Sequence, residues 1–173
     1  MNRCMASDLI KGRFPETVVV VEEFRGETTI TVDKEQLRNV LVFLKESESL
    51  YYDLLLDLAG IDAGIDTRID NGQATPRFTV VYLLHSMKYN NRLRIKVRLE
   101  EGASLDTVSD IWKAANWLER ETYDMFGILF NDHPDLRRIL LSDDFVGYPL
   151  RKDFPLQGHD FDKPINVCLE EER

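Results

Sequence analysis

The stretch that organises this sequence is Trp117-Leu118-Glu119-Arg120-Glu121-Thr122-Tyr123-Asp124-Met125-Phe126-Gly127, which concentrates charged and aromatic side chains. Upstream, Ser104 fits a helix N-cap, with Asp106 in the first turn, where a carboxylate interacts favourably with the helix dipole. Gly127 fits the left-handed position that ends many helices. Between these limits, mostly apolar residues recur at helical spacing: Val108, Ile111, Trp112, Ala115, Leu118, Thr122 and Phe126. The pattern predicts one long helix over residues 105–126.

One carboxylate, Glu119, falls inside this apolar stripe. At about 100° per residue it points to the same side as the stripe, whereas Arg120, Glu121 and Asp124 point elsewhere. A buried carboxylate without a partner costs several kcal/mol, so we expect either an arginine, from the pair Arg137-Arg138, or backbone N–H groups to meet Glu119. The alternative is that its side chain reaches water at the edge of the stripe.

Two blocks of sequence resemble a known signature. The first is Glu119-Arg120-Glu121, two residues, Asp124-Met125-Phe126, six residues, His133, three residues, Arg137, one residue, Ile139-Leu140. The second is Gly147-Tyr148-Pro149-Leu150-Arg151-Lys152-Asp153-Phe154. In this order they resemble the C subunit of NADH-quinone oxidoreductase, respiratory complex I. The resemblance is sharp over residues 112–156 and fades toward the N-terminus, where only the order of elements agrees.

This resemblance implies a cofactor-free structural subunit in the peripheral arm of a proton-translocating NADH:quinone oxidoreductase, with no catalytic site of its own. Other subunits would carry FMN and the iron–sulfur centres. The expected partners are the subunit that forms the quinone pocket and the adjacent iron–sulfur subunits, at the cytoplasmic face of the energy-transducing membrane. The expected interface or structural residues are Glu119, Arg120, Glu121, Asp124, His133, Arg137, Arg138, Tyr148, Pro149, Arg151, Lys152, Asp153 and Phe154.

The composition of the chain excludes several kinds of partner and site without reference to any family. The 173 residues carry a formal charge of −9, so phosphate-rich nucleic acid and anionic lipid are disfavoured partners. The two cysteines, Cys4 and Cys168, lack CxxC spacing and cannot build an iron–sulfur or zinc site. The longest apolar runs, residues 18–21 and 54–56, are too short to span a bilayer. We therefore expect contact with a membrane only through partner subunits.

The rest of the chain predicts an α+β fold. Strands are expected at residues 17–24 and 27–32, joined by Arg25-Gly26, and again at 51–59, 77–85 and 92–100. Asp33 and Gln36 form a capping-box pattern before a helix that buries Leu37, Val40, Leu41 and Leu44. Residues 60–76 read as an exposed polar tongue. A basic row, Arg94, Lys96 and Arg98, is expected to be solvated or to receive an acidic partner. The prediction is a largely antiparallel sheet covered by two helices, with a long extended C-terminal tail.

The tail sets a domain division, with an α+β core at residues 1–126 and an extended partner-wrapping tail at 127–173. The tail contains four of the six prolines and shows no helical or strand period. Its large apolar residues argue against a segment that stays in water: Phe130, Ile139, Leu140, Leu141, Phe145, Tyr148, Leu150 and Phe154. Long irregular segments of this kind are usually functional, so a partner surface is expected to bury it. The alternative is that it folds back on its own sheet.

Two other functions remain open at this level. The chain could be the equivalent subunit of a membrane-bound hydrogenase or another quinone-reducing dehydrogenase. It could also be a small independent enzyme with a metal on the loop Asp132-His133-Asp135, although a hydrated turn is the commoner role for such a loop. No GxGxxG, Walker A or GxSxG motif is present in the sequence.

Overall fold

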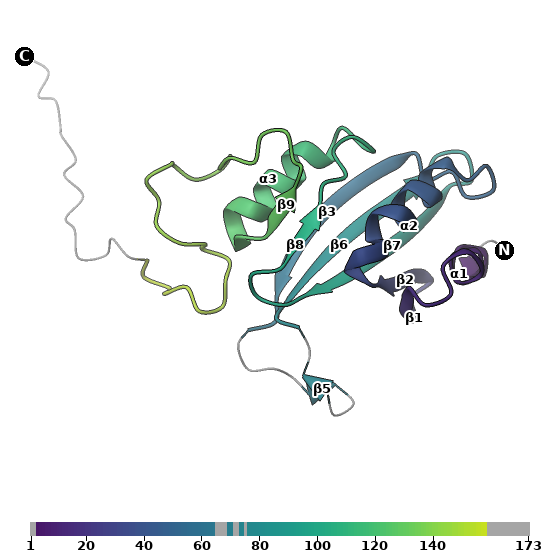
Figure 1. Ribbon diagram of the computed structural model, residues 1–173, viewed down its shortest axis with the longest axis horizontal. Coiled ribbons are helices and arrows are strands. Elements are labelled where there is room, and N and C mark those ends of the chain that lie inside the picture. The colour runs from purple at the N-terminus through teal and green to yellow at the C-terminus, as the bar shows by residue number, and fades with distance from the viewer. Residues whose placement is uncertain (1–2, 65–68, 71–72, 75, 159–173) are drawn as a thin grey trace, which may run out of the picture.

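The computed structural model describes residues 3–64, 69–70, 73–74 and 76–158. Its centre is a five-stranded sheet in the order β1-β2-β7-β6-β3 (Figure 1). The strands are β1 Val18–Phe24, β2 Glu27–Val32, β3 Leu54–Asp62, β6 Phe78–Ser86 and β7 Asn91–Leu99. All neighbours pair antiparallel except β2 and β7, which are parallel. The predicted largely antiparallel sheet is confirmed.

Three helices, where two were expected, pack on the sheet. They are α1 Arg3–Arg13, α2 Lys34–Glu46 and α3 Ala115–Phe126 (Figure 1). Alternate residues of β6 and β7 are buried, as expected when helices cover one face of a sheet. Leu37, Val40, Leu41 and Leu44 of α2 are buried as predicted. The predicted capping box is wrong, because Asp33 makes no side-chain cap bond and the Gln36 amide oxygen accepts from Asn39 instead.

The predicted helix start at Ser104 is also wrong. Residues Ser104–Asp106 form strand β8, which pairs parallel with β9, Leu129–Asn131, and α3 begins only at Ala115. Leu105 and Phe130 are opposite each other in this pair and both are buried. Residues 107–114 bury apolar side chains in turns, which produces a helix-like spacing without a helix. The predicted C-terminal end is confirmed, since Gly127 follows α3 in the left-handed conformation with φ 72°.

One glycine sets how α3 lies on the sheet. Gly60 pairs with Val80 of β6, whose side chain is in the core, and a Cβ on Gly60 would lie 2.7 Å from the Phe126 ring. Any larger residue would push the end of α3 away from β3. α3 therefore reaches the edge strand of the sheet, and the chain that follows it starts there.

The segment expected as a tongue contains short strands. β3 continues to Asp62, and β4 Ile69–Asp70 pairs with β5 Gln73–Ala74 in a hairpin that projects below the sheet (Figure 1). Residues 65–68, 71–72 and 75 of the expected tongue lie outside the described residues, as do Cys168 and the side chain of Cys4. On the basic row of β7, Arg94 donates to Glu27 at 2.7 Å and Lys96 lies 3.7 Å from Glu22.

Candidate partner-docking site

The carboxylate of Asp124 connects α3 to the tail. It is fully buried, and its Oδ2 accepts hydrogen bonds from three successive backbone N–H groups, those of Ile139 (3.0 Å), Leu140 (2.8 Å) and Leu141 (2.9 Å). Its Oδ1 accepts from Nη1 of Arg138 at 2.7 Å. Sequence reasoning correctly placed Asp124 off the apolar stripe of α3 but missed its burial. A helical wheel assumes that the far side of a helix faces water, and here the tail covers it.

The electrostatics of this contact favour the ionised carboxylate. Burial alone would raise the pKa of Asp124, but the three N–H donors and the Arg138 guanidinium hold that pKa below its ordinary value of 3.8. Nη2 of Arg138 also donates to the carbonyl oxygens of Phe145 and Gly147, each at 3.1 Å. Asp124 and Arg138 thus fix two bends of the tail against the helix.

The outer side of α3 holds the same loop through a second arginine. Arg120 donates from Nε to the Arg137 carbonyl and from Nη2 to the Arg138 carbonyl, both at 3.1 Å. The side chain of Arg137 itself is 74% exposed and pairs with Asp135 at 2.6 Å. Glu121, on the same helix, is exposed. Of the two predicted arginines, Arg138 is part of the packed structure and Arg137 lies at the surface.

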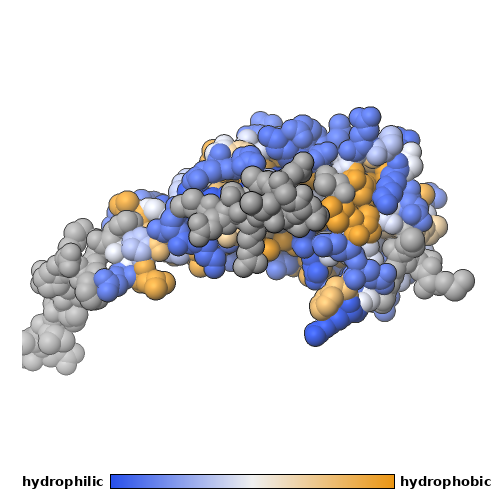
Figure 2. Space-filling view, turned by 90° about the horizontal axis from the view of Figure 1, so that it is seen from below, coloured by the Kyte–Doolittle hydropathy of each residue, from blue (hydrophilic) through white to orange (hydrophobic). Residues whose placement is uncertain are grey.

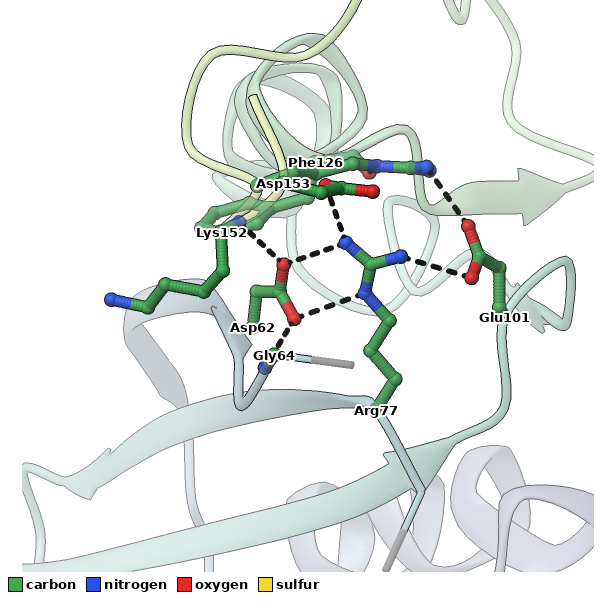
Figure 3. Close-up of polar contacts among 8 residues, drawn as sticks. Asp62, Gly64, Arg77, Glu101, Phe126, Lys152 and Asp153 are labelled. Atoms are coloured by element: carbon green, nitrogen blue, oxygen red, sulfur yellow. Dashed lines mark hydrogen bonds and ion pairs between the residues drawn. The ribbon is translucent and has the colours of Figure 1, made fainter. Parts of the chain in front are cut away.

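A second ionic cluster attaches the tail to the far end of the sheet (Figure 3). Arg77, at the start of β6, makes two bonds to the buried carboxylate of Asp62, at 3.1 and 3.0 Å. It also donates to Asp153 of the tail at 2.6 Å and to Glu101 at 2.9 Å. The backbone N–H of Lys152 donates to Asp62 at 2.8 Å. Sequence reasoning named Lys152 and Asp153 but missed the other three residues, because no local pattern links positions so far apart.

Asp62 is ionised in this cluster. Burial would raise its pKa, but the Arg77 guanidinium and the N–H groups of Lys152 and Gly64 lower that pKa from 3.8 to about 2. Arg77 has a raised pKa, caused first by its bond to Asp62. The pKa of Asp153 is lowered, again first by Arg77. One buried arginine is therefore shared between the core and the tail.

Tyr148 and Arg151 of the tail pack against the C-terminal end of α3. A Cβ on Gly127 would lie 2.5 Å from the Tyr148 ring, so only glycine allows the ring to pack there. Arg151 lies 4.6 Å from the centroid of that ring and donates to the Phe126 carbonyl at 2.6 Å. The side chain of Arg151 is thus used within the chain. Phe154 stacks on Phe145 with 5.9 Å between ring centroids, and Pro149 is half-buried.

Glu119 is bound by a backbone N–H group, one of the two kinds of partner expected from the sequence, and not by an arginine. The fully buried carboxylate accepts from the backbone N–H of Val108 at 2.7 Å and from the Thr107 hydroxyl at 2.5 Å. The expected bond to Arg137 or Arg138 is wrong, since these side chains bind Asp135 and Asp124. Burial raises the pKa of Glu119 from 4.5 to about 7, against the opposing effect of the two hydrogen bonds. Glu119 fixes the β8–α3 connection.

The loop proposed as a metal site has its histidine fully engaged. His133 Nδ1 accepts from the backbone N–H of Asp135 at 3.0 Å, and Nε2 lies 3.1 Å from the Asn116 carbonyl. Because Nδ1 is an acceptor, Nε2 carries the proton, and neither nitrogen offers a lone pair to a metal. Within the described ranges, no three His, Cys, Asp or Glu side chains gather as a metal site would require.

The fixed tail still presents apolar side chains to solvent. Trp117 on α3 is 69% exposed, and Leu140, Val146 and Leu150 are 63%, 70% and 53% exposed. The tail extends from the body at the left of Figure 2, where hydrophobic and hydrophilic surface lie side by side. An exposed tryptophan beside a rigid loop is typical of a protein-binding surface. Exposed apolar side chains on a segment fixed by buried ionic contacts are what a preformed docking surface would present.

No described helix has the length and apolar character needed to cross a bilayer. Residues 30–160 match the family described as respiratory-chain NADH dehydrogenase, 30 Kd subunit. The C subunit of NADH-quinone oxidoreductase from Geobacter metallireducens is 51% identical over 150 residues, which covers 86% of this chain and 87% of that relative. Its counterpart in Geobacter sulfurreducens is 49% identical over 152 residues, covering 87% and 88%.

Two solved structures are similar to this chain. A trypsin-resistant fragment of Nqo5 has a TM-score of 0.63 and 29% identity, covering 76% of this chain and 98% of the fragment. A chain of membrane-bound sulfane sulfur reductase, an archaeal respiratory membrane complex, shares the fold at a TM-score of 0.72 and 23% identity, covering 90% and 87%. The chain therefore belongs to the family of the 30 kDa subunit of respiratory-chain NADH dehydrogenase, and its relatives are C subunits of NADH-quinone oxidoreductase.

Proposed function

We propose that this chain is a structural subunit in the peripheral arm of a proton-translocating NADH:quinone oxidoreductase. It supports electron transfer from NADH to quinone by holding the subunits that carry FMN and the iron–sulfur centres. Its family membership supports the choice of complex. The observation that carries the structural role is that the tail is fixed by buried ionic contacts while Leu140, Val146 and Leu150 face solvent.

Rigidity matters for this role because a preorganised surface loses little conformational entropy when it binds. The three N–H bonds to Asp124 and the shared Arg77 order the tail before any partner arrives. A partner then needs to cover only the exposed side chains. We infer that the chain divides into a core at 1–126 and a partner-wrapping tail at 127–173, except that β9, at the start of the tail, belongs with the core because it pairs with β8 and buries Phe130.

The partners proposed for this surface are the subunit that forms the quinone pocket and the iron–sulfur subunits next to it. The chain would then be peripheral, at the cytoplasmic face of the energy-transducing membrane, and held there through these subunits. We further propose that the chain carries no cofactor. A purified sample should then show a featureless visible spectrum and no stoichiometric metal, whereas a bound chromophore or metal would contradict this part of the proposal.

The test of docking uses pairs of variants that match in exposure. Trp117→Ala on α3 is compared with Phe24→Ala on the β1–β2 hairpin, since both side chains are 69% exposed. Leu140→Ser in the tail is compared with Met87→Ser after β6, both 63% exposed. The measurement is the amount of each variant that co-purifies with the other subunits, together with NADH:quinone activity of the preparation.

Trp117→Ala and Leu140→Ser should each weaken assembly by about tenfold or more, because buried interface anchors typically contribute about 2 kcal/mol. The matched control variants, Phe24→Ala and Met87→Ser, should assemble normally. Urea unfolding of all four isolated chains separates docking from folding, and equal midpoints are expected since every altered side chain is exposed. Assembly that is equally good in all four variants would exclude this surface as the interface.

A further inference from the structure

A pocket lies at the end of the sheet away from the proposed docking surface. Because β2 and β7 run parallel, with Thr28 opposite Leu93, the β1–β2 turn and the β6–β7 turn meet at the same end. The Arg77 cluster lies at the other end of these strands, where β6 begins and β7 ends. Between the two turns is a pocket of about 310 Å³. It therefore shares no residue with the docking surface.

The lining of this pocket is positively charged although the chain is acidic. Arg25 and Arg92 both line it, together with Asn90 and the single carboxylate of Glu27. That carboxylate already accepts a 2.7 Å bond from Arg94. Among the described residues, neither Arg25 nor Arg92 pairs with a carboxylate, and the Arg25 guanidinium lies 5.1 Å from the centroid of the Phe24 ring. Two uncompensated guanidinium groups thus face one small cavity.

A histidine adds a further polar atom. His85 lines the pocket and pairs with Arg92 across β6 and β7, so both side chains lie on the same face of the sheet. The Nδ1 atom of His85 is shielded from solvent and has no hydrogen-bond partner among the described residues. A buried polar atom of this kind costs free energy unless it finds a partner. Because no partner fixes Nδ1 among the described residues, a turn of the ring can bring this atom to a ligand oxygen in the pocket.

We propose that this pocket binds a phosphate-type oxyanion. Arginine forks match the oxygens of a phosphate group, and the amide of Asn90 and the ring of His85 can donate to the remaining oxygens. The volume suits a single phosphoryl group with its first waters. The net charge of −9 repels anions from most of the surface, so binding here depends on this local arrangement. Free phosphate and a phospholipid headgroup present the same chemistry.

The test follows amide resonances of the 173-residue chain while inorganic phosphate replaces chloride at constant ionic strength. We expect saturable shifts confined to residues 25–27, 85 and 90–92. Arg92→Gln should weaken phosphate binding about tenfold or more, as the loss of a charge-assisted pair does. Lys88→Gln is the matched control, because it removes one positive charge at the same end of the molecule from a side chain that lies over the Tyr89 ring instead. It should change the affinity by less than about twofold.

The source of the anion is identified by sedimentation with phosphatidylcholine vesicles that contain or lack phosphatidic acid. Binding only to the phosphatidic acid vesicles, lost in Arg92→Gln, assigns the pocket to a lipid headgroup. Phosphate binding without vesicle binding assigns it to the free ion. Shifts that do not saturate, or that are the same in Arg92→Gln and in the unaltered chain, would overturn the proposal.

Discussion

Two carboxylates on α3, Asp124 and Glu119, have no surface exposed to solvent, yet their pKa values shift in opposite directions. Asp124 accepts from three backbone N–H groups and one guanidinium, and its pKa is lowered. Glu119 accepts from one N–H and one hydroxyl, and burial raises its pKa to about 7. Loss of contact with solvent therefore does not by itself decide the charge of a carboxylate. Burial raises the pKa, N–H donors and a cation lower it, and the balance of these effects decides the charge.

The difference also separates two structural roles. Asp124 binds a segment of the tail that has no helix or strand of its own, so its negative charge holds that segment in place. Glu119 joins two parts of the core that hydrophobic packing already brings together, and it can be neutral near pH 7 without leaving an unpaired charge. Substitutions at Asp124, Glu119 and the groups that bind them separate the two roles.

Asp124→Ala should destabilise the chain most. It leaves Arg138 without its buried counter-ion and three N–H groups without an acceptor, which should lower the free energy of unfolding by about 3–5 kcal/mol. Urea unfolding measures the loss, and hydrogen exchange should show that the amides of Leu140 and Leu141 lose protection. Glu121→Ala, an exposed change on the same helix, is the control. Retained amide protection in Asp124→Ala would show that packing alone orders the tail.

The pH dependence of stability should have opposite signs for the two residues. The raised pKa of Glu119 means that the unfolded state loses its proton first, so this residue lowers stability as pH rises from 4.5 to about 7, by about 3 kcal/mol in total. The lowered pKa of Asp124 means that its contribution is present above pH 3.8 and is lost below it.

Urea unfolding between pH 2 and 8 measures both effects. In Glu119→Gln the decline between pH 4.5 and 7 should disappear, because the amide keeps an acceptor for Val108 and cannot ionise. A profile that is the same with Gln at this position would mean that Glu119 keeps an ordinary pKa, and the contrast with Asp124 would fail.

Arg138→Met removes the cation from Asp124 and leaves the three N–H donors in place. We expect a loss of about 2 kcal/mol, since hydrogen bonds to charged groups contribute about 1.5–3 kcal/mol. The pKa of Asp124 should rise, which carbon-detected NMR titration of its carboxyl group can follow. If that pKa stays unchanged, the N–H groups alone account for the ionisation of Asp124.

Thr107→Val should have the smallest effect. It removes the hydroxyl that donates to Glu119 and accepts from the backbone N–H of Ser109, while keeping the shape of the side chain, at a cost of about 1 kcal/mol. The pKa of Glu119 should rise further, because that hydroxyl opposes the effect of burial. Thermal unfolding at pH 5 and pH 8 measures it, with a larger loss expected at pH 8. An equal loss at both values would mean that the hydroxyl does not distinguish the two forms of Glu119.

Sequence reasoning succeeded where the signal is local. The strands β6 and β7, the buried apolar residues of α2 and the left-handed Gly127 all depend on neighbours within a few residues. It failed where a distant segment decides the outcome. Ser104 and Asp106 look like a helix start, but they pair with β9, which follows α3 in the chain.

The candidate site shows the same limit. Asp124 was recognised as a site residue from the family signature, whereas its partners, the N–H groups of residues 139–141, have no side-chain signature at all. Arg77 lies 76 residues from Asp153 in the sequence and was missed entirely. Backbone donors and distant ion pairs become visible only when the chain is folded.

Hydrogen exchange of the chain alone and within the assembled complex shows whether the ordered tail and the outer side of α3 form the docking surface. We expect assembly to add protection around Trp117, over residues 137–141 and over 147–156, with no change at the β1–β2 turn. Added protection confined to the open face of the sheet, with the tail exchanging as it does in the isolated chain, would contradict it.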